Sequence, residues 1–231
     1  MLFRRTSREI VRRMHLVDLL APPACVACRA PLRDGLVCGA CLRRMPWLRG
    51  HRCPRCALPR HRAGCPAASS AFDRAWAPLA YEGPARDLVR ALKFDGALPV
   101  AGLMAAHLAA NLPLDLRHGV EVVAVPPHRG RLRRRGFDPA ALLAAGLAAR
   151  AGLPLAPCLK RTDRGRRQVG AGRSTRRSAG RFAAVATAPP PRAALLVDDV
   201  HTTGATLEAC ARALKASGAA WVGVATYVRT L

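Results

Sequence analysis

Apolar residues between positions 72 and 231 gather in short runs, and these runs show two kinds of spacing. Val122–Val125 and Ala193–Val197 are uninterrupted, which is typical of strands buried on both faces of a parallel sheet. Segments with apolar positions three and four residues apart follow at Pro139–Ala151 and Leu207–Leu214, and this spacing predicts helices. The order of strand, loop and helix predicts an α/β fold with a doubly wound, mostly parallel sheet.

The rest of this region continues the alternation. We expect a first strand, two helices, a further strand before a long polar segment, and a last strand near position 228, with a short linker ahead of them all. The strands are expected at Trp76–Tyr81, near Pro154–Leu159 and at Trp221–Val228, the helices at Gly83–Leu92 and Val100–Asn111, and the linker at Ala67–Ala71. Cys158 and Cys210 lie among apolar neighbours and are expected in the core.

Cysteines are concentrated near the start of the chain, with seven of the nine between positions 25 and 65. The pairs Cys25-x-x-Cys28 and Cys38-x-x-Cys41 have the spacing of two metal-binding turns, and together they complete a tetrahedral structural zinc site. Disulfides are the alternative. The chain shows no secretory signal, so a reducing cytoplasm is expected, and zinc is favoured there.

Three further cysteines, Cys53, Cys56 and Cys65, predict a second zinc site that lacks a fourth cysteine. His61 or His51 could supply the missing ligand. Alternatively, the site has lost its metal and the loop persists through packing. The segment has little apolar content, so metal binding would provide most of its folding free energy.

The chain is strongly basic, with 38 Lys and Arg against 14 Asp and Glu and a net charge of +24. This surplus favours a polyanionic or phosphorylated partner, although an Arg-, Ala- and Gly-rich composition also arises from a GC-rich genome. No apolar run approaches the roughly 20 residues that cross a membrane. We expect an N-terminal helix at 1–24, a zinc ribbon at 25–70 and an α/β domain at 72–231.

Two acidic residues, Asp198 and Asp199, follow the predicted buried strand at Ala193–Val197, and the turn Thr202–Thr206 comes next. Ligands of parallel sheets bind beyond the carboxyl ends of the strands. A Gly-containing turn at a helix N-terminus offers amides and hydroxyls to a phosphate. Paired carboxylates beside it suit the hydroxyls of a sugar phosphate. An ordinary turn near two acids is the alternative.

Two basic segments accompany this site. Arg129–Arg135 holds five arginines in seven positions directly after the predicted strand Val122–Val125, where a pyrophosphate would lie. A solvated charge run is the alternative there. The second segment, Lys160–Phe182, is almost free of apolar residues, and we expect a mobile loop.

The stretch VDDVHTTGAT resembles the phosphoribosyl pyrophosphate (PRPP) loop of type I phosphoribosyltransferases. Together with the Cys-x-x-Cys ribbon, Lys93-Phe94-x-Gly96, Val125-Pro126 and Arg135-Gly136-Phe137, it resembles the ComF family of amidophosphoribosyltransferase-like competence proteins over about residues 16–231. This resemblance implies the type I phosphoribosyltransferase fold and PRPP binding with Mg²⁺. Asp138 stands where the family usually has Asn, and Ala68 where it often has a cysteine.

The resemblance also implies roles for single residues. Asp198 and Asp199 would hold the ribose hydroxyls, and Thr202, Thr203, Gly204, Ala205 and Thr206 the 5-phosphate. The loop would place Arg161, Thr162, Gln168 and Arg173 on the pyrophosphate side, with Arg161 counted with the two acids as catalytic. Arg133, Arg134 and Arg135, with Gln168 and Arg173, would contact pyrophosphate or a DNA backbone.

Two functions follow from these expectations, and the sequence leaves open whether catalysis is retained. One is a PRPP-binding protein that handles single-stranded DNA in the cytoplasm during DNA uptake, with a competence helicase or recombination proteins as candidate partners. Few aromatic residues (4%) favour contacts to the DNA backbone over base stacking. The other is an active phosphoribosyltransferase with an unknown nitrogen acceptor.

Overall fold

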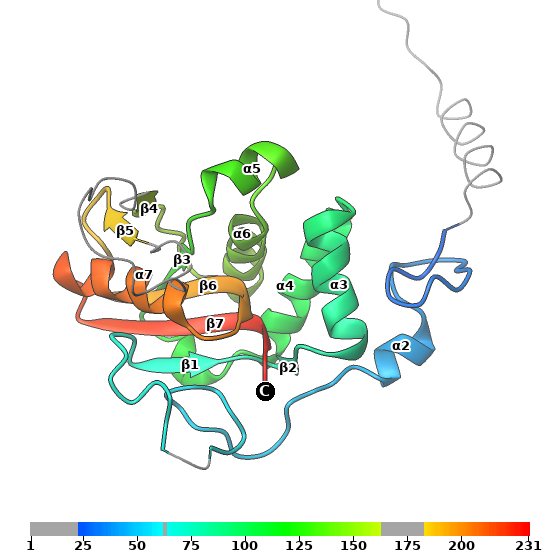
Figure 1. The fold of residues 1–231 in the computed structure, drawn as a ribbon, viewed down its shortest axis with the longest axis horizontal. Helices are drawn as coiled ribbons and strands as arrows, with labels where there is room; N and C mark the ends of the chain where they lie inside the picture. The colour runs from blue at the N-terminus through cyan, green and yellow to red at the C-terminus, as the bar shows by residue number, and fades with distance from the viewer. Residues whose placement is uncertain (1–22, 62–63, 163–182) are drawn as a thin grey trace, which may run out of the picture.

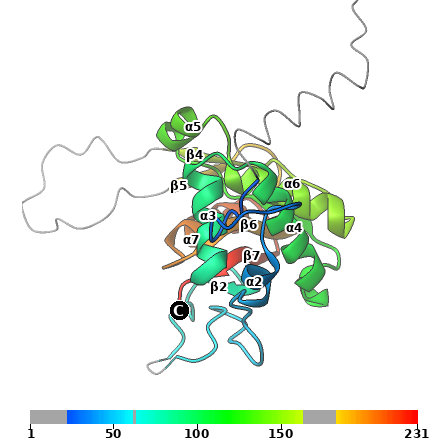
Figure 2. The same ribbon diagram turned by 90° about the vertical axis from the view of Figure 1, so that its right-hand side faces the viewer.

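The computed structural model describes residues 23–61, 64–162 and 183–231. Figures 1 and 2 show an α/β body with the cysteine-rich segment along one side. The predicted N-terminal helix at 1–24 lies almost wholly outside the described residues. Gln168 and Arg173 also lie outside them.

A five-stranded parallel sheet forms the centre of the α/β domain, as the sequence predicts. Its strands run in the order β1-β7-β6-β3, and β2 continues the β1 edge along β7. The strands are β1 (Arg74–Trp76), β2 (Leu79–Ala80), β3 (Glu121–Ala124), β6 (Ala193–His201) and β7 (Trp221–Arg229).

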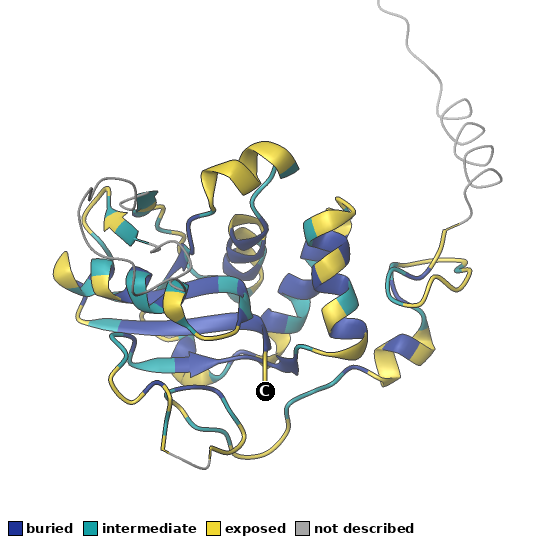
Figure 3. Cartoon of the chain, in the orientation of Figure 1, coloured by how far each residue is buried: buried dark blue, intermediate teal, exposed yellow. Residues whose placement is uncertain are grey.

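Strand β6 lies in the middle of the sheet and is buried on both faces, as expected from its uninterrupted apolar run (Figure 3). Successive side chains of a strand point to opposite faces. Leu195 and Val197 accordingly join the core on one face, and Ala194 and Leu196 join the core on the other. The two layers of helices therefore hold β6, and the acids at its end, in a fixed position.

Helices cover both faces of the sheet. Three of them, α3 (Gly83–Phe94), α4 (Pro99–Asn111) and α6 (Pro139–Ala151), contribute to the first core, and α7 (Ala205–Ala216) contributes to the second. Each of the first three has a proline in its first turn, where the missing N–H costs nothing. A short 3₁₀ turn follows α4 at Leu114–Leu116.

The cysteine-rich segment is attached to both cores. Its first half, with the short helix α2 (Gly39–Arg43), buries Cys25 and Cys41 against the first core. Its second half buries Cys56 and Ala67 in the second core, beside α7. In the segment expected as a linker, 67–71, Ala67 is buried while Ala68 and Ser69 are exposed.

Several predicted strands have different bounds in the structure. The first is interrupted at Pro78, because proline has no N–H to donate to the sheet. Residues 154–156 add only a bridge to Val122, while β4 (Leu159–Thr162) pairs with β5 (Ala183–Ala186) in a separate antiparallel sheet. The prediction of a strand at Pro154–Leu159 was therefore wrong.

The first arginine-rich segment, for which the sequence predicted no secondary structure, is a helix, α5 (Arg129–Arg135). Its N-terminus is capped by His128, whose ring nitrogen accepts a hydrogen bond from the Gly130 amide at 3.1 Å. Its C-terminus is capped by Gly136 in the left-handed conformation, with φ +78°. The caps explain the helix, because the segment buries none of its residues.

Candidate functional site

The carboxyl end of the sheet borders a cavity of about 340 Å³. The ends of α3 and β6, the start of α7, the loop after β3, helix α5 and strand β4 all contribute side chains to it. Its charged and hydroxyl-bearing lining includes Lys93, Arg131, Arg135, Asp138, Arg161, Asp198, Asp199, Thr202 and Thr206.

Both acids of the predicted pair line this cavity, and they lie within β6 rather than beyond it. Asp199 is buried, and its carboxylate forms an ion pair with Lys93 at 2.8 Å between Nζ and Oδ1. The half-buried Asp198 turns one carboxylate oxygen to the Asp199 amide, which donates to it at 2.8 Å. Burial, and then the neighbouring Asp199 charge, raise the pKa of Asp198 well above its ordinary value. A cation or sugar hydroxyl at the cavity would relieve this repulsion.

The turn after β6 leads directly into α7, as the sequence predicts. Gly204 is the N-cap residue of α7, with φ +80°, a conformation that favours glycine. No side-chain hydrogen bond caps the N-terminus of this helix. Thr202 and Thr206 line the cavity, while the Thr203 hydroxyl accepts a hydrogen bond from the Ala205 amide at 3.4 Å. The first turn of α7 thus offers amides and hydroxyls beside the two carboxylates.

Helix α5 contributes two arginines to the cavity, Arg131 and Arg135. Arg135 is half-buried, with its guanidinium 5.3 Å from the centre of the Phe94 ring, and burial lowers its pKa while the charge of Asp199 opposes that effect. The predicted phosphate contacts Arg133 and Arg134 are exposed and do not line the cavity. The helix therefore presents one basic face to the site and another to solvent.

Asp138 stands where the ComF family, which the sequence resembles, usually has Asn. It lines the cavity and is also the N-cap of α6. Its carboxylate accepts a hydrogen bond from the Ala140 amide at 3.0 Å. Asp and Asn serve about equally well at an N-cap, so the departure preserves the helix start. Burial raises the pKa of this carboxyl.

The flexible-loop residues are only partly described. Arg161 lies on β4 and lines the cavity. Thr162 ends the same strand and is not among the cavity residues. Three further cavity residues, Lys93, His128 and Tyr81, have no role predicted from the sequence. Their side chains reach the cavity from helix and strand ends, a proximity that local patterns do not reveal.

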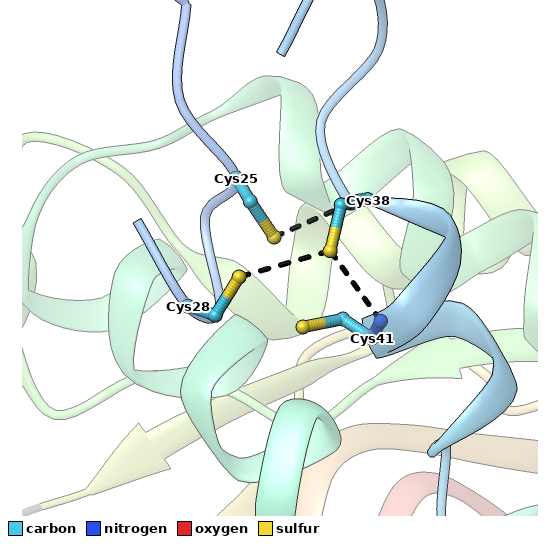
Figure 4. A group of neighbouring side chains, drawn as sticks. All are labelled: Cys25, Cys28, Cys38 and Cys41. Atoms are coloured by element: carbon cyan, nitrogen blue, oxygen red, sulfur yellow. Dashed lines mark hydrogen bonds between the residues drawn. The ribbon is translucent and has the colours of Figure 1, made fainter. Parts of the chain in front are cut away.

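The four predicted ligands of the first zinc site converge from two knuckles (Figure 4). Their sulfurs lie within 4.8 Å of one another, and the Sγ atoms of Cys28 and Cys38 are 3.7 Å apart. Tetrahedral zinc with Zn–S bonds of about 2.3 Å separates its sulfurs by about 3.8 Å, whereas a disulfide needs about 2.05 Å. Cys25 and Cys38 also accept backbone amide hydrogen bonds, which suit thiolate ligands. The donor set fits zinc.

The second cluster consists of Cys53, Cys56, His61 and Cys65, whose ligand atoms also lie within 4.8 Å of one another. The Sγ atoms of Cys53 and Cys65 are 3.6 Å apart. His61 therefore completes the set, and His51 is not part of it. Three thiols and one imidazole are a common donor set for structural zinc.

Each cluster contains thiols whose pKa values are shifted in opposite directions. Burial by itself raises the pKa of Cys25 and Cys53, but hydrogen bonds outweigh it and bring both pKa values down to about 6. Burial raises the pKa of Cys41 and Cys56 to about 12. Hydrogen bonds also lower the pKa of Cys38, so each cluster has at least one readily ionised thiol and one that a cation must deprotonate, which bound zinc does.

Residues 16–71 match the family model of the double zinc ribbon domain. No curated protein matches the chain. The protein is therefore a double zinc ribbon followed by an α/β domain with a mostly parallel five-stranded sheet.

Within the part of the chain that the structure describes, no helix combines the length and apolar character needed to cross a membrane.

Proposed function

We propose that this protein is a phosphoribosyltransferase-fold protein that binds PRPP or a related ribose phosphate together with Mg²⁺. In this proposal it acts in DNA uptake by handling single-stranded DNA in the cytoplasm. The observation that carries the ligand is the junction of β6 and α7, where two carboxylates and a hydroxyl-bearing helix start meet in one cavity.

The chemistry of this cavity matches the parts of PRPP. The carboxylates of Asp198 and Asp199 can accept hydrogen bonds from the vicinal ribose hydroxyls. The amides and hydroxyls of Thr202–Thr206 suit the 5-phosphate, since a helix N-terminus favours an anion. Arg131 and Arg135 face the same space and can pair with pyrophosphate oxygens. Magnesium would neutralise part of the phosphate charge.

The exposed face of α5 supports the second half of the proposal. Arg133 and Arg134 do not line the cavity and are exposed, so a long polyanion can reach them. The net charge of +24 acts in the same direction. Binding of this kind depends mainly on phosphate contacts and falls steeply with added salt.

Catalysis of phosphoribosyl transfer is the alternative function, favoured by the position of Arg161 and Arg135 at the cavity. In that reaction pyrophosphate leaves the ribose C1 and a nitrogen nucleophile takes its place. Arginines facing the leaving group would stabilise the charge that develops on it. The acceptor would identify the reaction, and product formation from PRPP would distinguish turnover from binding.

The experiment that tests the proposal titrates PRPP with Mg²⁺ and a fluorescent dT oligonucleotide, each alone and in competition. Three proteins are compared, namely the wild type, the double variant Arg133→Glu/Arg134→Glu, and the control Arg150→Glu on the distant end of α6. We expect the double variant to bind DNA about tenfold or more weakly while its PRPP affinity is unchanged. The control should change neither affinity.

Two results would count against the proposal separately. If the wild-type protein fails to bind PRPP, PRPP is not the ligand of the cavity. A double variant with wild-type DNA affinity removes α5 as the DNA contact.

A further inference from the structure

Arg229, the last residue of β7, connects the second cysteine cluster with the threonine turn. It is buried, with 6% of its surface exposed. Its Nε donates to the carbonyl of Cys56 at 2.9 Å, and its Nη1 donates to the carbonyls of His201 and Thr202 at 2.8 and 2.6 Å. One guanidinium therefore holds a ligand residue of the second cluster and the start of the turn in fixed register. Its planar shape makes the geometry directional.

His201 carries this connection into the turn itself. Its ring is buried, makes an edge-to-face contact with Phe72, and lies against Gly204, where a Cβ atom would come within 3.0 Å of its Nε2. Burial and the nearby Arg229 charge lower the pKa of His201 to about 4, so the ring is neutral at physiological pH. The carbonyl and the ring of His201 thus link Arg229 to the glycine that starts α7.

A second connection runs through the segment that follows the cluster. The Arg55 guanidinium, two residues from Cys53, donates to the carbonyls of Asp73 at 3.0 Å and Ser70 at 2.7 Å. The Ala71 amide in turn donates to the Glu208 carboxylate at 2.8 Å, in the first turn of α7. The second cluster is therefore tied to both sides of the threonine turn, because α7 begins where that turn ends.

The first cluster has no comparable connection among the described residues. It packs on the first core through Cys25 and Cys41, and its ion pair with α3, between Arg29 and Asp95, measures 2.9 Å. Those two side chains are 71% and 50% exposed. Exposed pairs of this kind contribute little to stability. The two clusters thus differ in what their metal can hold in place.

We propose that the metal of the second cluster regulates the phosphate site, with Arg229 as the positioning residue that couples Cys56 to the Thr202–Thr206 turn. Loss of zinc from Cys53, Cys56, His61 and Cys65 frees the Cys56 carbonyl to move, which releases Arg229 and loosens the turn that would hold the phosphate. This inference rests on the proposed function for the identity of the ligand. The coupling itself is a property of the described contacts.

The test compares two variants that each remove one ligand of one cluster. Cys53→Ser should release only the second zinc, and Cys28→Ser only the first, with zinc content measured by atomic absorption. Hydrogen exchange of the Thr202–Thr206 amides, read by mass spectrometry without any ligand, should become faster in Cys53→Ser and stay at the wild-type rate in Cys28→Ser. Affinity for ribose 5-phosphate with Mg²⁺ should fall about fivefold or more in Cys53→Ser only.

A reciprocal measurement on the wild type needs no variant. Coupling between two sites acts equally in both directions. Saturating ribose 5-phosphate should therefore protect one of the two zinc ions from a chromogenic chelator at equilibrium, raising the affinity of that site for zinc about fivefold, and leave the other unchanged. Arg229→Lys, which keeps the charge but loses the planar fork, should retain both zinc ions and abolish this protection.

The outcomes separate the two proposals. If the wild type does not bind ribose 5-phosphate, but the amides of the threonine turn exchange faster in Cys53→Ser, the proposed function is contradicted and the coupling is supported. Equal exchange and equal affinity in the two cysteine variants overturn the coupling and leave the ligand proposal intact. The coupling is also overturned if ribose 5-phosphate binds but protects both zinc ions equally, or protects neither.

Discussion

The ion pair between Lys93 and Asp199 lies at the cavity, and the effect of its removal can be measured directly. Lys93 lies in the last turn of α3, and its ammonium reaches the acid at the end of β6. Replacing Lys93 with Met keeps the length of the side chain and removes the charge. Asp199 then remains as a buried carboxylate next to Asp198, without the ammonium that pairs with it.

The distance sets the scale of the effect. Two unit charges 2.8 Å apart attract by about 1.5 kcal/mol in bulk water and by about 6 kcal/mol at the effective dielectric constant of about 20 that suits protein sites. The Lys93 and Asp199 side chains are 22% and 8% exposed, so the pair lies between these limits. Desolvation and the ordering of the lysine side chain oppose the attraction. We expect a coupling free energy of about 2–3 kcal/mol.

A double-mutant cycle isolates this coupling. The free energy of unfolding is measured in urea for the wild type, Lys93→Met, Asp199→Asn and the double variant, all loaded with zinc at pH 7 and low salt. The interactions of Asp198 with each partner cancel from the cycle, because Asp198 is present in all four proteins. Lys93→Met should be the least stable, because it leaves an uncompensated buried charge. The second substitution should restore part of the loss.

A coupling below about 0.5 kcal/mol would refute this reasoning. That value is typical of exposed ion pairs, and it would mean that water screens Lys93 from Asp199 in solution.

Three further predictions concern the surrounding framework. Gly146→Ala would place a Cβ 2.7 Å from the Cβ of Ala105, where α6 packs on α4, and should lower the free energy of unfolding in urea by about 1–3 kcal/mol. The control Gly102→Ala, whose Cβ would lie 3.8 Å from its nearest neighbour, should be neutral or stabilising, and equal effects of the two substitutions would contradict the packing. The pKa of His201 is lowered from 6.5 to about 4 in the folded protein, so between these pH values the unfolded chain binds a proton that the folded protein excludes. As the pH drops from 6.5 to 4, the free energy of unfolding should therefore fall by about 3 kcal/mol more in the wild type than in His201→Gln. Parallel pH profiles of the two proteins would contradict this. Asp138→Asn should keep the N-cap of α6 and raise the affinity for PRPP, because it removes a negative charge from the cavity. Asp138→Ala should lower the free energy of unfolding by about 1 kcal/mol, and a melting curve unchanged in this variant would show that the cap is not formed.

Local sequence patterns predicted the parts of the fold that local physics determines. The bounds of α6, Pro139–Ala151, agree with the structure because an N-cap, a first-turn proline and a left-handed glycine after its last residue all specify the same helix. The apolar run of β6 and the turn into α7 were likewise predicted. Paired cysteine turns identified the first zinc cluster, because the spacing itself carries the ligand geometry.

Other features depend on contacts between distant residues, and the sequence did not reveal them. Helix α5 has no buried side chain, so hydrophobic spacing could not mark it as a helix. The choice of His61 over His51 depends on how the second knuckle folds back. Lys93 and Arg229 act through partners far along the chain, at Asp199 and Cys56. The same holds for the small β4–β5 sheet, whose strands pair across residues 163–182.

In the proposed function, the end of β6 and the start of α7 form a site for a phosphorylated ribose. Calorimetric titration of the zinc-loaded protein with PRPP and Mg²⁺ tests it most directly, alongside Asp199→Asn as the matched isosteric variant. We expect one PRPP per chain, binding that requires Mg²⁺, and an affinity at least about tenfold weaker in Asp199→Asn, because the amide can no longer offer a charged acceptor to the ribose hydroxyl. Absence of binding to the wild type, or equal affinity in the two proteins, would contradict it.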